Sequence, residues 1–188
     1  MAIKTRRLAS YDWDVVAKLF GENGACGGCW CMYWRLPRGG KLWEESKGKK
    51  NRKALRQLVN GGQARAILAF DGDKPVGWCA YGPRSDFPRL QRVRALPKEF
   101  SRTTWSIVCF FVDKEYRRTG VATKLLQAAT REAFSAGATE VEGYPVKPKS
   151  ANMPPAFAFT GVEDIFTQCG YEKKVETGAS TQLYVRTK

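Results

Sequence analysis

A glycine and a small alanine follow two adjacent arginines in the stretch Arg117-Arg118-Thr119-Gly120-Val121-Ala122, where a predicted helix begins. The first amide groups of a helix have no hydrogen-bond partner within it, and the helix dipole adds partial positive charge at that end. Gly120 and Ala122 let an anion approach the main chain, and the two guanidinium groups offer charge-assisted hydrogen bonds. The start of this helix therefore predicts an anion site on the main chain of residues 118 to 123.

Three cysteines crowd a second stretch, CGGCWCMYWR at residues 26–35, with the spacing Cys26-x-x-Cys29-x-Cys31. Zinc needs four ligands in a closed structural site, but the sequence has no histidine and no second cysteine pair. Cys79, Cys109 and Cys169 lie in apolar or helical patterns that are typical of buried thiols. We therefore predict no metal site. An acyl-cysteine intermediate is a further use of these thiols, but no histidine is present to activate one.

The elements that position Gly120 are predicted from an apolar run and a helical stripe. The run WSIVCFFV at 105–112 lacks alternation, as expected for a central strand covered on both faces. An amphipathic helix follows, and TEVEGYPV at 139–146 returns as another strand. A strand, helix and strand in this order favour a parallel crossover. The predicted anion site thus lies where the central strand gives way to the helix.

Further elements are predicted on either side of this unit. They are a strand at 4–8, a helix capped by Ser10 or Asp12 and ended by Gly21, a helix at 49–60, a hairpin at Asp71-Gly72, a short helix at 161–168, and a final strand pair, YEKKV and TQLYVRT, around a glycine-containing turn. Irregular stretches are predicted at 21–46, 83–103 and 145–159. The pattern predicts an α/β fold, a mixed sheet flanked by helices, in one domain of residues 1–188.

The element order and the stretch from Arg117 to Ala122 resemble the GNAT family of N-acetyltransferases, whose acyl-CoA signature is Gln or Arg, two residues, Gly, one residue, and Gly or Ala. The resemblance covers most of the chain and implies acetyl-CoA as acyl donor, with no other cofactor. It also implies a central strand that splays from its parallel neighbour, so that its main chain pairs with pantetheine. The acyl-CoA residues that it implies are Phe110, Phe111, Val112, Arg117, Arg118, Thr119, Gly120, Val121, Ala122 and Thr123.

The resemblance fails at the residue that protonates the leaving thiolate. Relatives often carry a tyrosine on the last short helix, where this chain has Phe166, which has no proton to donate. We predict Tyr144 as the substitute acid and, because the chain lacks histidine, Glu142 as the general base. These two lie two residues apart on a strand and therefore share a face. The alternative is that both are surface residues of a half-exposed strand. In that case no dedicated acid is needed, because an ordinary thiol has a pKa of about 8.5 and its thiolate is a good enough leaving group.

By the same resemblance, the segment between the first two helices builds the acceptor pocket. The predicted acceptor-binding residues are Trp30, Tyr33, Trp34 and Arg35, acting through aromatic stacking and one positive charge. The alternative is a loop held in place by its own aromatic side chains. The segments CWCMYWR and VEGYPV also resemble a bacterial subgroup of the family.

The chain carries 32 Lys and Arg against 18 Asp and Glu, and this net charge of +14 favours polyanionic partners such as nucleic acid, acidic lipid or a phosphorylated ligand. Two basic clusters, at 47–56 and 84–94, are ordinarily explained as solvated faces. No recognisable nucleic-acid module occurs. Without a signal peptide or 18 consecutive apolar residues, we expect a cytoplasmic protein with reduced cysteines and no membrane partner.

The resemblance therefore implies an acetyl-CoA-dependent N-acetyltransferase that moves an acetyl group to a primary amine by direct transfer. A small-molecule acceptor is favoured over a protein terminus, and the molecule is expected to be a monomer or a homodimer. Two alternatives stay open. One is a non-catalytic acyl-CoA or RNA-binding module, favoured by Phe166 and the absent histidine. The other is an acetyltransferase acting on a charged tRNA, favoured by the basic charge and the aromatic residues at 30–34.

Overall fold

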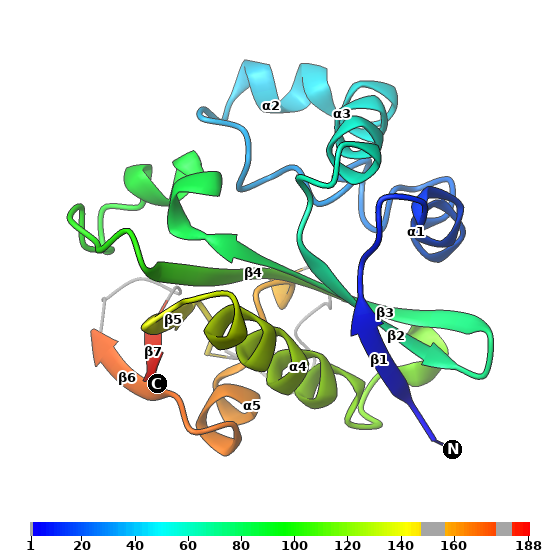
Figure 1. The fold of residues 1–188 in the computed structure, drawn as a ribbon. Coiled ribbons are helices and arrows are strands. Elements are labelled where there is room, and N and C mark those ends of the chain that lie inside the picture. Colours follow the sequence, from blue (N-terminus) through cyan, green and yellow to red (C-terminus); the bar gives the residue numbers. More distant parts are fainter. Residues whose placement is uncertain (1, 148–156, 176–181) are drawn as a thin grey trace.

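The apolar run predicted as the central strand forms β4 (Thr104–Val112), in the middle of a seven-stranded sheet (Figure 1). The structure is a computed structural model and describes residues 2–147, 157–175 and 182–188. The other strands are β1 (Lys4–Arg7), β2 (Ala66–Asp71), β3 (Lys74–Pro83), β5 (Glu140–Gly143), β6 (Glu172–Val175) and β7 (Leu183–Thr187). They lie in the order β1-β2-β3-β4-β5-β7-β6. Only the β4–β5 pair is parallel among these strands, which confirms the mixed sheet and the parallel crossover.

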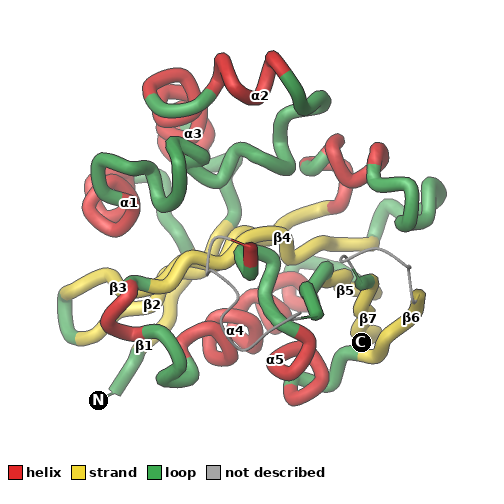
Figure 2. Tube along the Cα trace, turned by 180° about the vertical axis from the view of Figure 1, so that it is seen from behind, coloured by secondary structure: helices red, strands yellow, loops and turns green. Residues whose placement is uncertain are grey.

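Helices cover both faces of the sheet. They are α1 (Trp13–Phe20), α2 (Lys41–Ser46), α3 (Lys49–Asn60), α4 (Val121–Ser135) and α5 (Glu163–Gln168). In Figure 1 the first three lie on one face of the sheet, and α4 lies on the other, and Figure 2 shows α5 beside α4 on that second face. Each face has its own hydrophobic cluster, one with α1, α3 and residues 30–34, the other with α4 and Phe166.

The parallel pairing of β4 with β5 is short. It runs from Thr104 opposite Glu140 to Ile107 opposite Gly143, and β4 then continues to Val112 without β5. Part of the gap is taken by the segment before α5, because the Phe110 N–H donates to the Phe159 carbonyl at 2.6 Å. The predicted strand at 139–146 is therefore too long: Pro145 has no N–H to continue a ladder, and Val146 pairs with Val162 instead.

Helix α4 lies close against the sheet because β3 has a glycine beneath it. A Cβ on Gly77 would lie 2.9 Å from Val121, closer than real Cβ atoms come to a neighbour, and 3.0 Å from Leu125, which is a tight contact. Both contacted residues belong to the first two turns of α4. The missing side chain on β3 therefore sets how near the start of α4 approaches the sheet.

Several local predictions need correction. Asp12 precedes α1 but makes no side-chain cap; its carboxylate accepts from the Ala9 N–H at 2.7 Å and from the Arg6 guanidinium at 2.8 Å. The stretches predicted as irregular contain α2 and two short 3-10 helices, Arg84–Asp86 and Pro88–Arg92. The predicted turn between YEKKV and TQLYVRT, the first residue of TQLYVRT, and residues 148–156 of the third irregular stretch lie outside the described residues.

Candidate functional site

The start of α4 has the geometry expected of an anion site. Gly120 adopts φ +84°, a left-handed conformation that favours glycine, and a Cβ there would meet no atom within 4 Å. The first main-chain hydrogen bond of the helix joins the Lys124 N–H to the Gly120 carbonyl at 3.1 Å. The amides of Val121, Ala122 and Thr123 have no partner among the described residues. These N–H groups open onto an exposed surface at Gly120.

The two arginines before Gly120 differ in their freedom. Arg117 donates through Nε to the Val112 carbonyl at 3.1 Å, which ties it to the end of β4. Arg118 is exposed at φ +63° and has no hydrogen bond or ion pair with any described residue. Thr119 is likewise held locally, since its hydroxyl donates to the Tyr116 carbonyl at 2.7 Å. Arg118 is therefore the cation at this helix start that an incoming anion meets unpaired.

Beside this helix start, the last residues of β4 are only partly available to a ligand. Phe110 is buried and its N–H is bonded to Phe159, while Phe111 and Val112 are half-buried. The Phe111 ring packs on Phe20, with ring centroids 5.6 Å apart. A ligand that pairs with the Phe110 main chain must first displace the Phe159 carbonyl.

Glu142 and Tyr144 form a buried polar network with two residues that sequence analysis did not place there. The Tyr144 hydroxyl donates to Glu142 Oε2 at 2.5 Å and lies 2.7 Å from the Ser106 hydroxyl. Arg84 donates through Nη1 to Glu142 Oε1 at 2.7 Å and through Nη2 to the Pro97 carbonyl at 2.6 Å. Arg84 is only 2% exposed, so the sequence-based expectation of a solvated basic cluster at 84–94 is wrong for this residue.

Burial and pairing set the protonation of this network. Burial raises the pKa of Glu142, and the Tyr144 hydrogen bond and the Arg84 charge oppose that shift. Burial, together with the negative charge of Glu142, raises the pKa of Tyr144 well above its ordinary value. Near neutral pH Tyr144 therefore keeps its proton and acts as a hydrogen-bond donor, while Glu142 is the group of the pair that gains and loses a proton.

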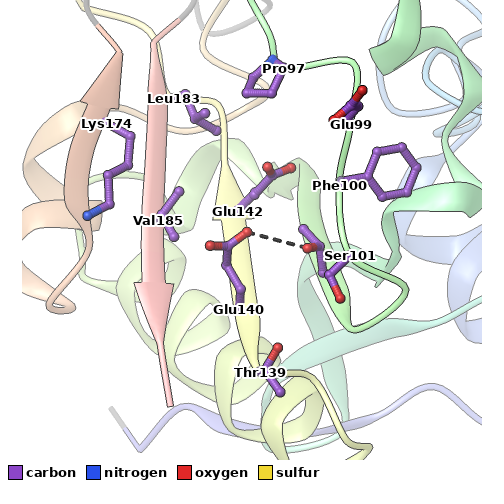
Figure 3. A pocket seen from close by; sticks show the side chains of 11 residues that line it. Pro97, Glu99, Phe100, Ser101, Thr139, Glu140, Glu142, Lys174, Leu183 and Val185 are labelled. Atoms are coloured by element: carbon purple, nitrogen blue, oxygen red, sulfur yellow. Dashed lines mark hydrogen bonds between the residues drawn. The ribbon is translucent and has the colours of Figure 1, made fainter.

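A cavity of about 450 Å³ opens over β5 and β7 and reaches Glu142 (Figure 3). Three carboxylates line it, from Glu99, Glu140 and Glu142, together with the apolar side chains of Phe100, Leu183 and Val185. In Figure 3 Glu140 and Glu142 extend from β5 toward the segment that carries Glu99 and Phe100. Tyr144 is fully buried and does not line the cavity.

The charges in this cavity are unbalanced. Glu142 is paired with Arg84, and the lining Lys174 is paired with Glu172 at 3.0 Å. Glu99 and Glu140 have no ion-pair partner among the described residues; Glu140 accepts only a 3.4 Å hydrogen bond from Thr104. In a protein with a net charge of +14, this is a locally acidic surface.

The aromatic segment at 26–35 divides into core and partly exposed residues. Trp30 is buried and stacks on Trp13, with ring centroids 5.7 Å apart. Trp34 is also buried, and its Nε1 has no hydrogen-bond partner among the described residues. Tyr33 is half-buried, with the Arg89 guanidinium 3.7 Å above its ring. Arg35 is half-buried over the Phe87 ring.

The cysteines of this segment lie in different environments. Cys26 is exposed, Cys29 is half-buried and Cys31 is buried. Within the described part of the chain, no group of three or more His, Cys, Asp or Glu side chains is placed to hold a metal ion. The Cys31 sulfur instead accepts a 3.2 Å hydrogen bond from Trp78 Nε1.

Phe166 occupies the core rather than a site surface. It is fully buried on α5, and its ring packs edge-on against Phe110 and Tyr171. The basic residues of α3 are also partly committed to packing, since Arg52 and Arg56 both lie over the Trp13 ring. Among the described residues, no helix is both long and apolar enough to span a bilayer.

Comparison with protein families decides the class. A family model described as the acetyltransferase (GNAT) family matches residues 30–150. The chain belongs to this family. No curated protein sequence matches it. The matched region includes β4, the helix start at Gly120 and β5, which together carry the features described above.

Solved structures of GNAT proteins share the fold along the whole chain. The PaiA N-acetyltransferase of Thermoplasma acidophilum, in complex with coenzyme A, has a TM-score of 0.58 at 14% identity and 100% coverage of both chains. The ribosomal-protein-S5-alanine acetyltransferase of Vibrio fischeri has a TM-score of 0.55 at 16% identity, covering 100% of this chain and 93% of that one. The aminoglycoside acetyltransferase AAC(6')-Ib, bound to coenzyme A and kanamycin, has a TM-score of 0.56 at 13% identity, covering 99% and 95%.

Proposed function

We propose that this GNAT protein is an acetyl-CoA-dependent N-acetyltransferase that moves an acetyl group directly to a primary amine. The observation that carries this proposal is the helix start at Gly120, where three unpartnered amides and the unpaired Arg118 lie next to the uncovered end of β4. Such a helix end suits the diphosphate of CoA, because its partial positive charge and free N–H groups match phosphate oxygens. The main chain from Phe110 to Val112 would then guide the pantetheine arm toward the gap between β4 and β5.

The chemistry then requires stabilisation of the oxyanion that forms when the amine attacks the thioester. The Phe110 N–H is the proposed donor, worth about 3 kcal/mol of transition-state stabilisation. It becomes available when the Phe159 carbonyl, now 2.6 Å away, moves off. Collapse of the tetrahedral intermediate expels the CoA thiolate, a leaving group whose pKa of about 8.5 makes prior protonation unnecessary.

Glu142 is the proposed general base. It lies where the cavity meets the buried network, so it contacts both an incoming amine and the Tyr144 hydroxyl. Arg84 fixes one carboxylate oxygen and Tyr144 the other, which leaves the remaining lone pairs of the carboxylate for the amine proton. Tyr144 serves as the proton donor closest to Glu142 and positions it.

The cavity supports a small cationic acceptor. Its volume of about 450 Å³ falls within the range of small-molecule sites. The unpaired carboxylates of Glu99 and Glu140 attract an ammonium group, and Phe100, Leu183 and Val185 provide an apolar wall for its carbon chain. Among the residues predicted from the 26–35 segment, Tyr33 and Arg35 keep partly exposed surfaces and remain proposed acceptor contacts.

The proposal is tested by measuring whether the protein transfers acetyl groups from acetyl-CoA to amines. Purified protein is incubated with acetyl-CoA and a panel of primary amines that includes monoamines, polyamines and amino sugars, and acetylated products are identified by mass spectrometry. We expect a cationic amine with an apolar stem to be acetylated. Calorimetry with CoA in parallel separates the rival class: CoA binding without turnover of any amine supports a non-catalytic acyl-CoA-binding module. That rival is motivated by the occupied Phe110 N–H and the missing hydroxyl at Phe166.

A further inference from the structure

Residues 158–161 form a turn that lies against β4 beyond the end of β5. A 2.9 Å hydrogen bond from the N–H of its last residue to the carbonyl of its first closes the turn, and the Phe159 carbonyl accepts from the Phe110 N–H at 2.6 Å. The turn is also joined to the chain that continues from β5, because the Val146 N–H donates to the Gly161 carbonyl at 2.9 Å. The 158–161 turn therefore bridges β4 and the chain beyond β5, on the edge of β4 that β5 leaves unpaired.

A glycine allows the turn to lie this close. Gly161 adopts φ +91°, a left-handed conformation that favours glycine, and a Cβ there would lie 2.7 Å from the Phe166 ring and 3.3 Å from the Phe110 ring. The first distance is shorter than real Cβ contacts, and the Phe166 ring is fully buried. Any other residue would therefore strain the backbone and push the turn away from these rings. The closed position of the turn is thus specified by the sequence.

The side chain of Phe159 joins the same turn to the 26–35 segment. Its ring packs edge-on against Tyr33, with ring centroids 5.6 Å apart, and lies 6.3 Å from the Trp34 ring. Tyr33 is itself held in place, because the Arg89 guanidinium lies 3.7 Å from its ring centroid and donates to its carbonyl at 3.4 Å. Phe159 thus contacts the proposed acyl-CoA site through its carbonyl and a proposed acceptor residue through its ring.

We propose that the 158–161 turn is an autoinhibitory latch, which closes β4 in the free protein and must move off before acetyl-CoA binds. The inference rests on the proposed function, because it takes the main chain from Phe110 to Val112 as the pantetheine site. A chain that adds to the edge of a sheet binds through main-chain groups that have no partner. The Phe110 N–H already has one. CoA therefore binds only to the fraction of molecules in which the turn is open, and its apparent affinity is lower by that fraction.

The Phe159 ring determines how often the turn opens. The hydrogen bond of the Phe159 carbonyl forms whatever side chain residue 159 carries, whereas the contacts with Tyr33 and Trp34 depend on the ring. An edge-on aromatic pair shifts an equilibrium between two arrangements by about threefold to tenfold. Truncation of the ring should therefore open the turn more often, and it changes no residue that is proposed to bind CoA.

The experiment compares wild type with Phe159→Ala and with Phe157→Ala, a control in the same segment whose side chain is 65% exposed. Hydrogen exchange at the Phe110 amide, measured by NMR without ligand and relative to amides in the middle of α4, reports opening of the turn. Calorimetry with CoA reports affinity. We expect Phe159→Ala to exchange faster at Phe110 alone and to bind CoA about threefold to tenfold more tightly, while Phe157→Ala matches wild type in both.

A measurement on the wild type alone keeps the test decisive if Phe159→Ala does not fold. The nuclear Overhauser effect between the Phe159 and Tyr33 rings should be present in the free protein and disappear when CoA saturates it. Persistence of this effect with CoA bound would overturn the latch and leave the acyl-CoA site intact.

Two further results in the variants would also overturn the latch. One is CoA affinity that is unchanged or weaker in Phe159→Ala, and the other is exchange at Phe110 that rises only in step with the α4 amides. Absence of CoA binding in all three proteins is a different outcome, because it would overturn the proposed function together with the latch.

Discussion

The ring of Phe166 lies directly against Gly143, at the last residue of β5, so that a Cβ on Gly143 would overlap the ring. We expect Gly143→Ala to lower the free energy of unfolding by about 1–3 kcal/mol, because extra volume in a packed core forces its neighbours to shift. Urea unfolding measures this. In the double variant Gly143→Ala/Phe166→Leu, the smaller side chain makes room, so its loss should be less than the sum of the two single losses. Additive losses would contradict the contact.

Gly120→Glu should weaken CoA binding by about tenfold to a hundredfold, because the new carboxylate repels the diphosphate and covers amides that each give a charge-assisted hydrogen bond. Calorimetry with CoA measures the change. Gly137→Glu is the matched control: Gly137 has φ +97° and open space around it, so the backbone strain is similar, but it lies at the far end of α4. Equal losses in both variants would mean that strain, not the helix start, explains the effect.

Glu142→Gln should lower kcat by about 10²–10⁴-fold, because the amide keeps the size of the side chain but cannot take up the amine proton. Its single oxygen can accept from Arg84 or from Tyr144, whereas the carboxylate accepts from both. In the wild type, kcat should rise with pH as Glu142 loses its proton. Because burial raises the pKa of Glu142, this rise should occur at a pH above the ordinary carboxyl pKa of 4.5. The variant should lack this acidic limb. A limb of unchanged position and height in Glu142→Gln would remove Glu142 as the base.

The raised pKa of Glu142 also predicts how the stability of the protein changes with pH. Because its pKa is raised in the folded state, the folded protein holds the proton more tightly than the unfolded chain does. The stability that this proton provides is present below pH 4.5 and is lost as the pH rises through the folded pKa. Thermal melts across this window should show a smaller decline for Glu142→Gln than for the wild type.

Tyr144→Phe should lower the free energy of unfolding by about 1–3 kcal/mol, because it leaves the Glu142 carboxylate and the Ser106 hydroxyl without their shared partner. It should also lower kcat, since Glu142 loses a group that orients it. Tyr184→Phe removes a longer, partly exposed hydrogen bond of 3.2 Å to Glu163 and serves as control. A kcat that falls equally in both variants would argue against a specific role for Tyr144.

The aromatic segment offers a test that separates acceptor binding from packing. Tyr33→Ala should raise KM for the amine and should cost less stability than truncation of a fully buried ring, because Tyr33 is only half-buried. Trp30→Ala should instead cost about 3–5 kcal/mol of stability, as expected for truncating a buried tryptophan. Steady-state kinetics and urea unfolding distinguish the two. An unchanged KM for Tyr33→Ala would exclude that side chain from the acceptor site.

The β4–α4–β5 unit was predictable because its signals are local. An apolar run without alternation, a glycine at the helix start and a 3.6-residue stripe each lie within a few residues of the feature that they specify. Helix α2 gave no such signal, because none of its residues is buried and it has no apolar stripe. Helix α3 has buried residues at Leu55 and Val59, and its bounds match the prediction.

The buried network was only half predictable. Glu142 and Tyr144 share a strand face, and strand periodicity brings them together. Arg84 and Ser106 join them from positions 58 and 38 residues away along the chain, and an arginine after a proline carries no local sign of burial. The hydrogen bond from the Phe110 N–H on β4 to the Phe159 carbonyl is also a long-range contact, because it depends on how the segment before α5 returns to the sheet.

Gly77 lies on β3 and is not among the residues proposed to bind acetyl-CoA or the amine. It nevertheless sets the distance between the sheet and the start of α4, whose amides are proposed to hold CoA. Replacing it would raise the first turn of α4 from the sheet and tilt the free N–H groups relative to the end of β4. The affinity for CoA thus depends on how closely α4 packs on the sheet. A substitution that changes the volume of the core beneath α4 would therefore also change CoA affinity.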